Sequence, residues 1–99
     1  MYKTLEQQLK AVTRDGANIR HIKNQSEEVK LEAVKQKGTA IFYVENPSEE
    51  IKLAAVSNDG EAIRYIKNPS EELQLISVKQ DGNLIFYITR PSELVQLAG

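Results

Sequence analysis

The sequence predicts an all-α protein, a right-handed α-solenoid of about nine short helices. Three observations predict this fold. A pattern of 22 residues recurs along the 99-residue chain, each copy opens with residues that typically start a helix, and apolar residues return at helical spacing. A repeat period of about 20–50 residues is typical of stacked arrays. We therefore expect a single solenoid domain over residues 1–99.

The copies divide the chain into four complete units and one half unit. Twelve of 22 positions agree between residues 46–67 and 68–89, and twelve agree between residues 24–45 and 46–67. Residues 2–23 form a more divergent copy, and residues 90–99 match the first half of a unit. Helices this short are marginal alone in water, so each unit must be stabilised by packing on its neighbours.

Each unit is expected to contain two short helices joined by a tight turn. In the third unit we expect Asn46 to cap the first helix, with Pro47 in its first position and Glu49 completing a capping box. Gly60 would end this helix, because glycine readily takes the left-handed conformation found there. The second helix would cover about residues 61–67.

Apolar residues repeat at the same places of each unit and define the expected core. The first helices supply a leucine column and a valine column, and the second helices supply two columns of Ile or Val. One further position is always small, which indicates a close approach of two helices. These columns are Leu9, Leu31, Leu53, Leu75, Leu97; Val12, Val34, Val56, Val78; Ile19, Ile41, Ile63, Ile85; Ile22, Val44, Ile66, Ile88; and Ala11, Ala33, Ala55, Ser77, Gly99.

Composition argues against several functional classes. A formal net charge of −1 argues against a tight general binder of nucleic acid, which needs a basic surface. The chain has no cysteine, hence no disulfide framework and no thiolate zinc site. No stretch resembles a signal peptide or approaches a membrane span, so we expect a cytoplasmic protein that does not bind membranes.

Catalytic signatures are missing from the sequence. It contains no phosphate-binding glycine loop, dinucleotide fingerprint, metalloprotease motif or nucleophile elbow. Paired glutamates recur in three successive units, at residues 27–28, 49–50 and 71–72, which fits helix starts better than a single asymmetric catalytic site. His21 is the one histidine and stands in a column otherwise held by tyrosine. We therefore expect no enzymatic activity, no catalytic residue, no cofactor and no metal.

One column alternates between arginine and phenylalanine. A deeply buried site rarely accepts both, because an unpaired buried charge costs several kcal/mol. The column is therefore expected near the surface, beside the tyrosine column, and such residues are common anchors of protein interfaces. The alternative is that superhelical curvature buries the column in some units, or that phenylalanine packs on a neighbouring tyrosine. The predicted partner-binding residues are Arg20, Phe42, Tyr43, Arg64, Phe86 and Tyr87.

The two terminal units depart from the pattern. In the first, Thr4 is the candidate helix cap, and Gln7 replaces an apolar residue, as expected for the polar outer face of a terminal cap. The last helix ends the sequence without a partner helix and carries Leu94 in a glutamate column. Three interpretations are open: this helix caps the array, it marks the truncation of a longer array, or it forms an edge for self-association, and its apolar character favours a homodimer.

The pattern N-P-S-E-E-x-x-L-x-A-V-K-x-x-G-x-A-I-x-Y-I resembles a family of short tandem two-helix repeats catalogued as a domain of unknown function. This family occurs in bacteria, phages and large viruses, and the resemblance covers essentially the whole chain. It implies an α-solenoid of interaction repeats without a shared enzymatic activity. Gln25, in place of proline, departs from the pattern and predicts a weaker local helix start. The residues that carry the resemblance best are Asn46, Pro47, Ser48, Glu49, Leu53, Val56, Gly60, Ile63, Tyr65 and Ile66.

Three functions stay open on the sequence alone. Protein binding through a repeated helix face is favoured, and the family's setting together with the small size suits a phage-encoded inhibitor of a host defence protein. Nucleic-acid binding is the second, because helical repeats can read RNA and aromatic rings can stack on bases. The third is a structural, self-assembling module.

Overall fold

A computed structural model describes residues 2–88 and 93–98 of the chain. Within these residues five α-helices alternate with four 3-10 helices, and there is no strand. The predicted all-α repeat architecture is confirmed. The elements are α1 (Leu5–Arg14), η1 (Gly16–His21), α2 (Glu27–Gln36), η2 (Gly38–Tyr43), α3 (Glu49–Asn58), η3 (Gly60–Tyr65), α4 (Glu71–Gln80), η4 (Gly82–Tyr87) and α5 (Glu93–Ala98).

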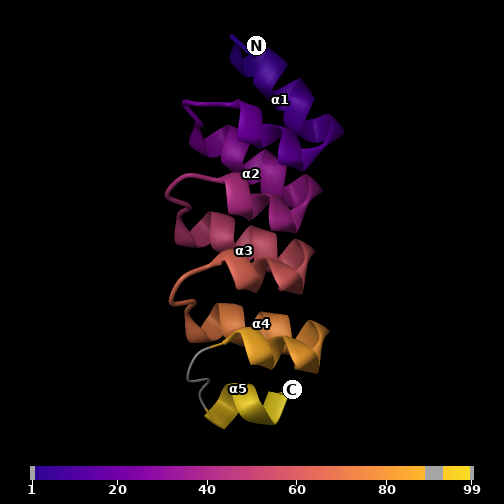
Figure 1. Ribbon diagram of the computed structural model, residues 1–99, viewed down its shortest axis with the longest axis vertical. Helices are drawn as coiled ribbons and strands as arrows, with labels where there is room; N and C mark the ends of the chain where they lie inside the picture. Colours follow the sequence, from indigo (N-terminus) through magenta and orange to yellow (C-terminus); the bar gives the residue numbers. More distant parts are fainter. Residues whose placement is uncertain (1, 89–92, 99) are drawn as a thin grey trace.

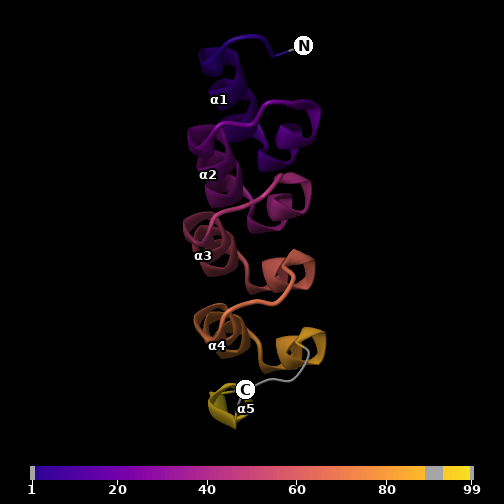
Figure 2. The ribbon, with the colours of Figure 1, turned by 90° about the vertical axis from the view of Figure 1, so that its left-hand side faces the viewer.

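The helices form two parallel columns along a molecule of 46 × 20 × 17 Å (Figures 1 and 2). Figure 2 shows the α-helices in one column and the 3-10 helices in the other, with the two termini at opposite ends of the stack. Each of the four complete units contributes one helix to each column. Neighbours in sequence are therefore neighbours in space, as expected for a solenoid. Among the described helices, none has the length and apolar character needed to cross a membrane.

The start of α3 differs from the expectation in its register. Ser48, not Asn46, is the N-cap of α3, and its Oγ accepts a hydrogen bond from the N–H of Ile51 at 3.3 Å. Asn46 instead takes a left-handed conformation with φ 48°, which asparagine tolerates better than most residues. The chain thus turns at Asn46-Pro47 before the helix begins. Glu49 is the first helical residue and completes no capping box.

The capping box occurs in the first unit, where the sequence favoured it least. The Oγ1 of Thr4 accepts from the N–H of Gln7 at 3.1 Å, and the Oε1 of Gln7 accepts from the N–H of Thr4 at 3.3 Å. Thr4 is therefore a complete cap, and Gln7 serves the helix start in addition to keeping the outer face polar.

The turn after α3 also differs from the expectation. In the third unit α3 continues to Asn58, and Asp59 then takes an extended conformation with φ −152°. The Oδ1 of Asp59 accepts from the N–H of Glu61 at 3.0 Å and caps the next element. That element is a 3-10 helix over Gly60–Tyr65, where a helix over residues 61–67 was expected.

Gly16 and Gly38 are required by close packing and not by a left-handed backbone. No glycine among the described residues has a positive φ, so the predicted left-handed helix end is wrong. A Cβ on Gly38 would overlap the carbonyl oxygen of Ala55 in the following unit, and one on Gly16 would overlap that of Ala33. The small-residue column therefore marks a close approach of two units, as predicted. The glycine of one unit packs against the small residue of the next unit at this place.

The core runs between the two columns of helices. The predicted isoleucine and valine columns are buried in the described units, apart from half-buried Ile85, whereas the leucine column is only half-buried and Leu97 is exposed. A different α-helical column is buried most completely. Gly99 and the side chain of Leu94 lie outside the described part. The fully buried α-helical column is Val29, Ile51, Leu73 and Val95.

Side-chain amides tie some units to the units before them. Asn58 of α3 accepts from the N–H of Gly38 at 2.6 Å and donates to the carbonyl of Lys35 at 3.0 Å. Gln80 of α4 makes equivalent bonds to the third unit. These bonds join residues that are 20–24 positions apart, so they fix the stacking of whole units.

Gln25 also bridges two units instead of weakening a helix start. Its Nε2 donates to the carbonyls of Ile22 at 3.2 Å and Tyr43 at 3.0 Å, and its Oε1 accepts from the N–H of Glu45 at 2.9 Å. Position 25 precedes the cap, and α2 still begins beside a capping Ser26 and has the length of its neighbours. The proline-to-glutamine difference therefore lies outside the helix and does not shorten α2.

Candidate interaction surface

The alternating phenylalanine and arginine column lies on the outer side of the 3-10 helices. Phe42 and Phe86 are 61% and 83% exposed, and Arg20 and Arg64 are exposed as well. With about three residues per turn, Ile41 and its counterparts point to the core while the next two residues point outward. The predicted surface position of this column is confirmed.

Aromatic rings of neighbouring units contact each other along this surface. The ring of Phe42 lies 5.0 Å from that of Tyr43, centroid to centroid, at 81°, and 5.0 Å from that of Tyr65 at 63°. Both geometries are edge-to-face, which is a favourable arrangement of aromatic rings. The sequence analysis gave packing of phenylalanine on a neighbouring tyrosine as the alternative to an exposed contact. Phe42 does pack in this way, and it nevertheless remains mostly exposed.

The arginine of the next unit continues the same contacts. The guanidinium carbon of Arg64 lies 5.7 Å from the ring centroid of Tyr65 and 4.8 Å from that of Tyr87, within cation–π range. An Nη1–Oε1 distance of 3.9 Å to Glu61 adds a weak ion pair. We call the connected set Tyr43, Phe42, Tyr65, Arg64 and Tyr87 the aromatic–arginine row.

The row joins four of the six predicted residues and leaves two apart. Arg20 donates from Nη1 to the carbonyl of Ala17 at 3.0 Å, in the first unit. Phe86 lies at the opposite end, in η4, and is the most exposed large apolar residue described. Tyr65 belongs to the row although it was not among the predicted contacts. Its position in the tyrosine column was the signal that could have identified it.

A groove of about 380 Å³ runs beside the row between successive 3-10 helices. Its lining combines aromatic rings with two cations, Arg20 and Lys37. Neither cation forms an ion pair with a carboxylate among the described residues. The one carboxylate in the lining, that of Asp15, is engaged by the N–H of Ala17 at 3.0 Å. The groove therefore combines aromatic rings with two cations in a mixed polar and apolar lining.

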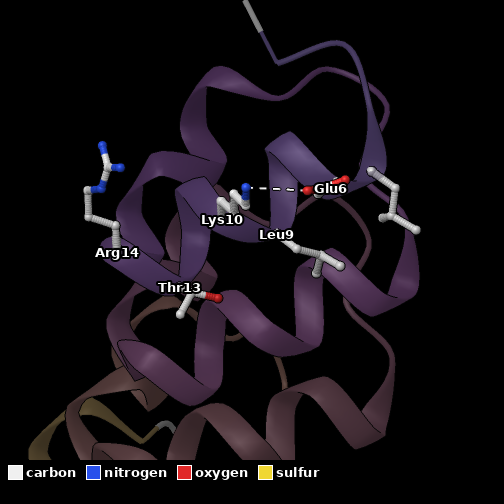
Figure 3. Close-up of a pocket in the computed structure, with 6 residues that line it drawn as sticks. Glu6, Leu9, Lys10, Thr13 and Arg14 are labelled. Atoms are coloured by element: carbon white, nitrogen blue, oxygen red, sulfur yellow. Dashed lines mark ion pairs between the residues drawn. The ribbon is translucent and has the colours of Figure 1, made fainter.

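A second apolar patch lies on the outer side of α1 and was not predicted (Figure 3). It is a shallow depression of about 610 Å³ that includes Leu5, which is 48% exposed, and Leu9. Figure 3 shows the ion pair between Glu6 and Lys10, at 3.3 Å, along one side of this patch. The available signal was Leu5 itself, because other units have glutamate at that position.

The described part of the chain shows no grouping of three or more histidine and carboxylate side chains that could hold a metal ion. His21 is exposed at the end of η1. Two of the repeated glutamates act in stacking: the Oε2 of Glu27 accepts from Ser48 Oγ at 2.7 Å, and that of Glu49 accepts from Ser70 Oγ at 2.9 Å. The repeated carboxylates thus link the helix starts of successive units.

No family model matches the sequence, no match was found among curated proteins, and none was found among solved structures. The relation to the family of short two-helix repeats stays a prediction from the sequence pattern.

Proposed function

We propose that this protein binds another protein through the aromatic–arginine row. The observation that carries the proposal is that rings and guanidinium hold one another in place across three successive units while remaining exposed. Exposed phenylalanine gains free energy when a partner buries it, by about 25 cal/mol per Å² of apolar surface. Side chains that are already ordered lose less conformational entropy on binding, which favours affinity.

The charge around the row supports a protein partner over a nucleic acid. Arg64 contacts the rings of Tyr65 and Tyr87 and lies 3.9 Å from a carboxylate oxygen of Glu61, so its positive charge is partly offset within the row. Aromatic and arginine side chains, by contrast, are the residues that most often dominate protein interfaces. The proposed inhibition of a host defence protein would be one instance of such binding, and it rests on the family resemblance.

Nucleic-acid binding is the second candidate because of the groove beside the row. Arg20 and Lys37 carry no carboxylate partner there among the described residues, and three aromatic rings line the same groove. Bases could stack on these rings while the cations contact phosphates. The two candidates differ in salt dependence, because each phosphate contact adds to the slope of affinity against salt concentration.

The test is a pull-down from nuclease-treated host lysate, followed by titration of the recovered protein. The double variant Phe42→Ala/Tyr65→Ala should weaken binding by about 30-fold or more, as expected when an interface anchor is truncated. Leu5→Ala is the matched control, since it removes an exposed apolar side chain away from the row. Circular dichroism should show the same helicity in all three proteins.

Equal affinity of the double variant and the native protein would refute the row as the binding surface. Recovery of nucleic acid alone from untreated lysate, with affinity falling steeply in salt, would replace the proposed function by the second candidate.

A further inference from the structure

Lys37 stands where the other three complete units have a capping aspartate. Asp15, Asp59 and Asp81 each accept a hydrogen bond at Oδ1, at 3.0 Å, from the N–H two residues further along, and so cap the 3-10 helix that follows. The side chain of Lys37 makes no such bond to η2. Loss of a capping aspartate lowers the stability of a helix. A repeat that gives up a local stabilising contact at one place points to a function for the residue found there.

The groove beside the aromatic–arginine row contains this lysine. Lys37 and Arg20 are both exposed and line the groove of about 380 Å³ together with three aromatic rings. The guanidinium of Arg20 is held by a hydrogen bond from Nη1 to the carbonyl of Ala17, at 3.0 Å. Asp15 supplies the one carboxylate of the lining, so two cations and one anion leave a net charge of +1. Within the described part of the chain, neither cation has an ion-pair partner.

Carboxylates lie on both sides of this positive charge along the array. Asp15 occupies the position equivalent to Lys37 in the preceding unit, and Asp59 occupies it in the following unit. A nucleic acid carries a phosphate on every nucleotide and needs a run of cations along its path. A backbone lying along the stack would meet a carboxylate one unit before and one unit after Lys37. The arrangement therefore favours a single anionic group over a polyanion.

A carboxylate matches the lining better than a phosphate group does. An ionised aspartate or glutamate carries one negative charge, whereas a phosphorylated side chain carries about −1.5 to −2 at neutral pH. Lysine and arginine form short charge-assisted hydrogen bonds to carboxylate oxygens. Phe42 and Tyr65, whose ring centroids are 5.0 Å apart, supply apolar surface in the same groove. An acidic residue beside an apolar one therefore complements both parts of the lining.

We propose that the groove between η1 and η2 receives an aspartate or glutamate of the partner protein, with an apolar residue next to it in the partner's sequence. The carboxylate bonds Lys37 and Arg20, and the apolar side chain packs on Phe42 and Tyr65. This inference rests on the proposed function and deepens it by naming the chemistry of the partner segment. Lys37 then provides a contact that selects the partner, in place of a helix cap.

The first test selects peptides from a displayed library of random sequences on the native chain, with Phe42→Ala/Tyr65→Ala for counter-selection. The selected peptides should be enriched in aspartate or glutamate next to an apolar residue. One of them is then synthesised in two forms, with the carboxylate or with the corresponding amide. By fluorescence anisotropy the amide form should bind about tenfold more weakly, as expected when hydrogen bonds to charged groups are lost.

Lys37→Gln shows where the carboxylate binds. This variant should bind the acidic peptide about tenfold more weakly, and the amide form should then lose little further affinity, because both changes remove the same contact. Lys35→Gln is the matched control. It removes the same charge from an exposed lysine outside the groove lining and should keep the full difference between the two peptides. Lys37→Arg keeps the charge and should retain most of the affinity.

The missing cap gives a second measurement on the same residue. Lys37→Asp should raise the urea midpoint of unfolding by about 0.5 M, because aspartate restores the bond that Asp59 makes in the next unit. The same variant reverses the charge and should abolish measurable binding of the acidic peptide. A variant that gains stability and loses affinity cannot owe the lost binding to misfolding.

Four results would overturn the inference. Two of them are selected peptides without acidic enrichment and a failure to select any peptide. The third is the same difference between the two peptides in Lys37→Gln as in the native chain, which would place the carboxylate elsewhere. The fourth is oligothymidylate that binds more tightly than the peptide and is lost in Lys37→Gln, which would make the occupant a phosphate backbone. The row itself is tested by the pull-down with Phe42→Ala/Tyr65→Ala, so the two failures are distinguishable.

Discussion

The junction between the first two units is built differently from the two junctions that follow. At the later junctions a side-chain amide reaches back to the preceding unit: Asn58 bonds the N–H of Gly38 at 2.6 Å, and Gln80 bonds that of Gly60 at 2.7 Å. At the first junction the corresponding residue, Gln36, donates instead to a carboxylate of its own helix. Residues at equivalent positions of the repeat therefore form different hydrogen bonds, within one helix at the first junction and between units at the later ones.

A single residue explains the difference. The Nε2 of Gln36 donates to the Oε2 of Glu32, four residues earlier, at 2.7 Å. The residues four positions before Asn58 and Gln80 are Ala54 and Ile76, which offer no acceptor. A charge-assisted bond within one helix is stronger than a neutral one, so Glu32 keeps the amide away from the preceding unit. The comparison teaches that a repeat contact depends on which local partners compete for it.

The largest effect is expected where a glycine faces the backbone of the next unit. Gly38→Ala should lower the free energy of unfolding by about 3 kcal/mol, because its Cβ would overlap the carbonyl oxygen of Ala55, which cannot yield. Gly60→Ala should cost less, about 1 kcal/mol, since its Cβ would meet the flexible ends of Gln80 and Leu84 at 2.9 Å. Urea titration monitored by circular dichroism measures both. Equal losses would show that the junctions are equally tight.

Removing an amide that joins two units should have an intermediate effect. Gln80→Ala leaves the N–H of Gly60 without its acceptor and frees the carbonyl of Val56, so we expect a loss of about 1–3 kcal/mol. Gln36→Ala is the matched control and should change stability by less than about 0.5 kcal/mol, because its bond lies on the exposed surface of one helix. Similar losses in the two variants, again by urea titration, would contradict the difference between junctions.

The smallest effect is the most specific, because its sign is reversed. Glu32→Ala should release Gln36 to bond the N–H of Gly16 and should stabilise the protein by about 0.5–1 kcal/mol. Alanine is also the better helix former, so the contribution of the amide is isolated by repeating Glu32→Ala in a Gln36→Ala background. Slower hydrogen exchange at Gly16 is the direct readout. An equal gain in both backgrounds would mean that the released amide does not reach Gly16.

Local physics made much of the fold predictable. The existence of two helices per unit follows from cap residues, turn residues and apolar spacing that recur in register. The outward position of the column that includes Phe42 and Arg64 follows from the cost of burying a charge, and the structure has it exposed. The register of the cap could not be settled in the same way, since Asn46 and Ser48 are both good caps.

The candidate site was predictable in composition but not in its connections. Aligning the repeats identifies the exposed column and the neighbouring tyrosine column. The sequence within one unit does not indicate, however, that Phe42 packs on Tyr65 or that Arg64 lies over Tyr87. These contacts depend on the rotation and rise between successive units. The same reason explains why the patch at Leu5 was missed, because a single substitution in a repeat does not reveal its neighbours.

The sequence by itself determined the repeat, the number of units and the alternation of core and surface, because these depend on residues close together in the chain. Tertiary structure alone decided how the units lock together: the amides of Asn58 and Gln80, the bridge made by Gln25, and the overlap that forces glycine at Gly38. Each of these contacts spans about one repeat, and its energy arises only when one unit lies on the next at a particular distance.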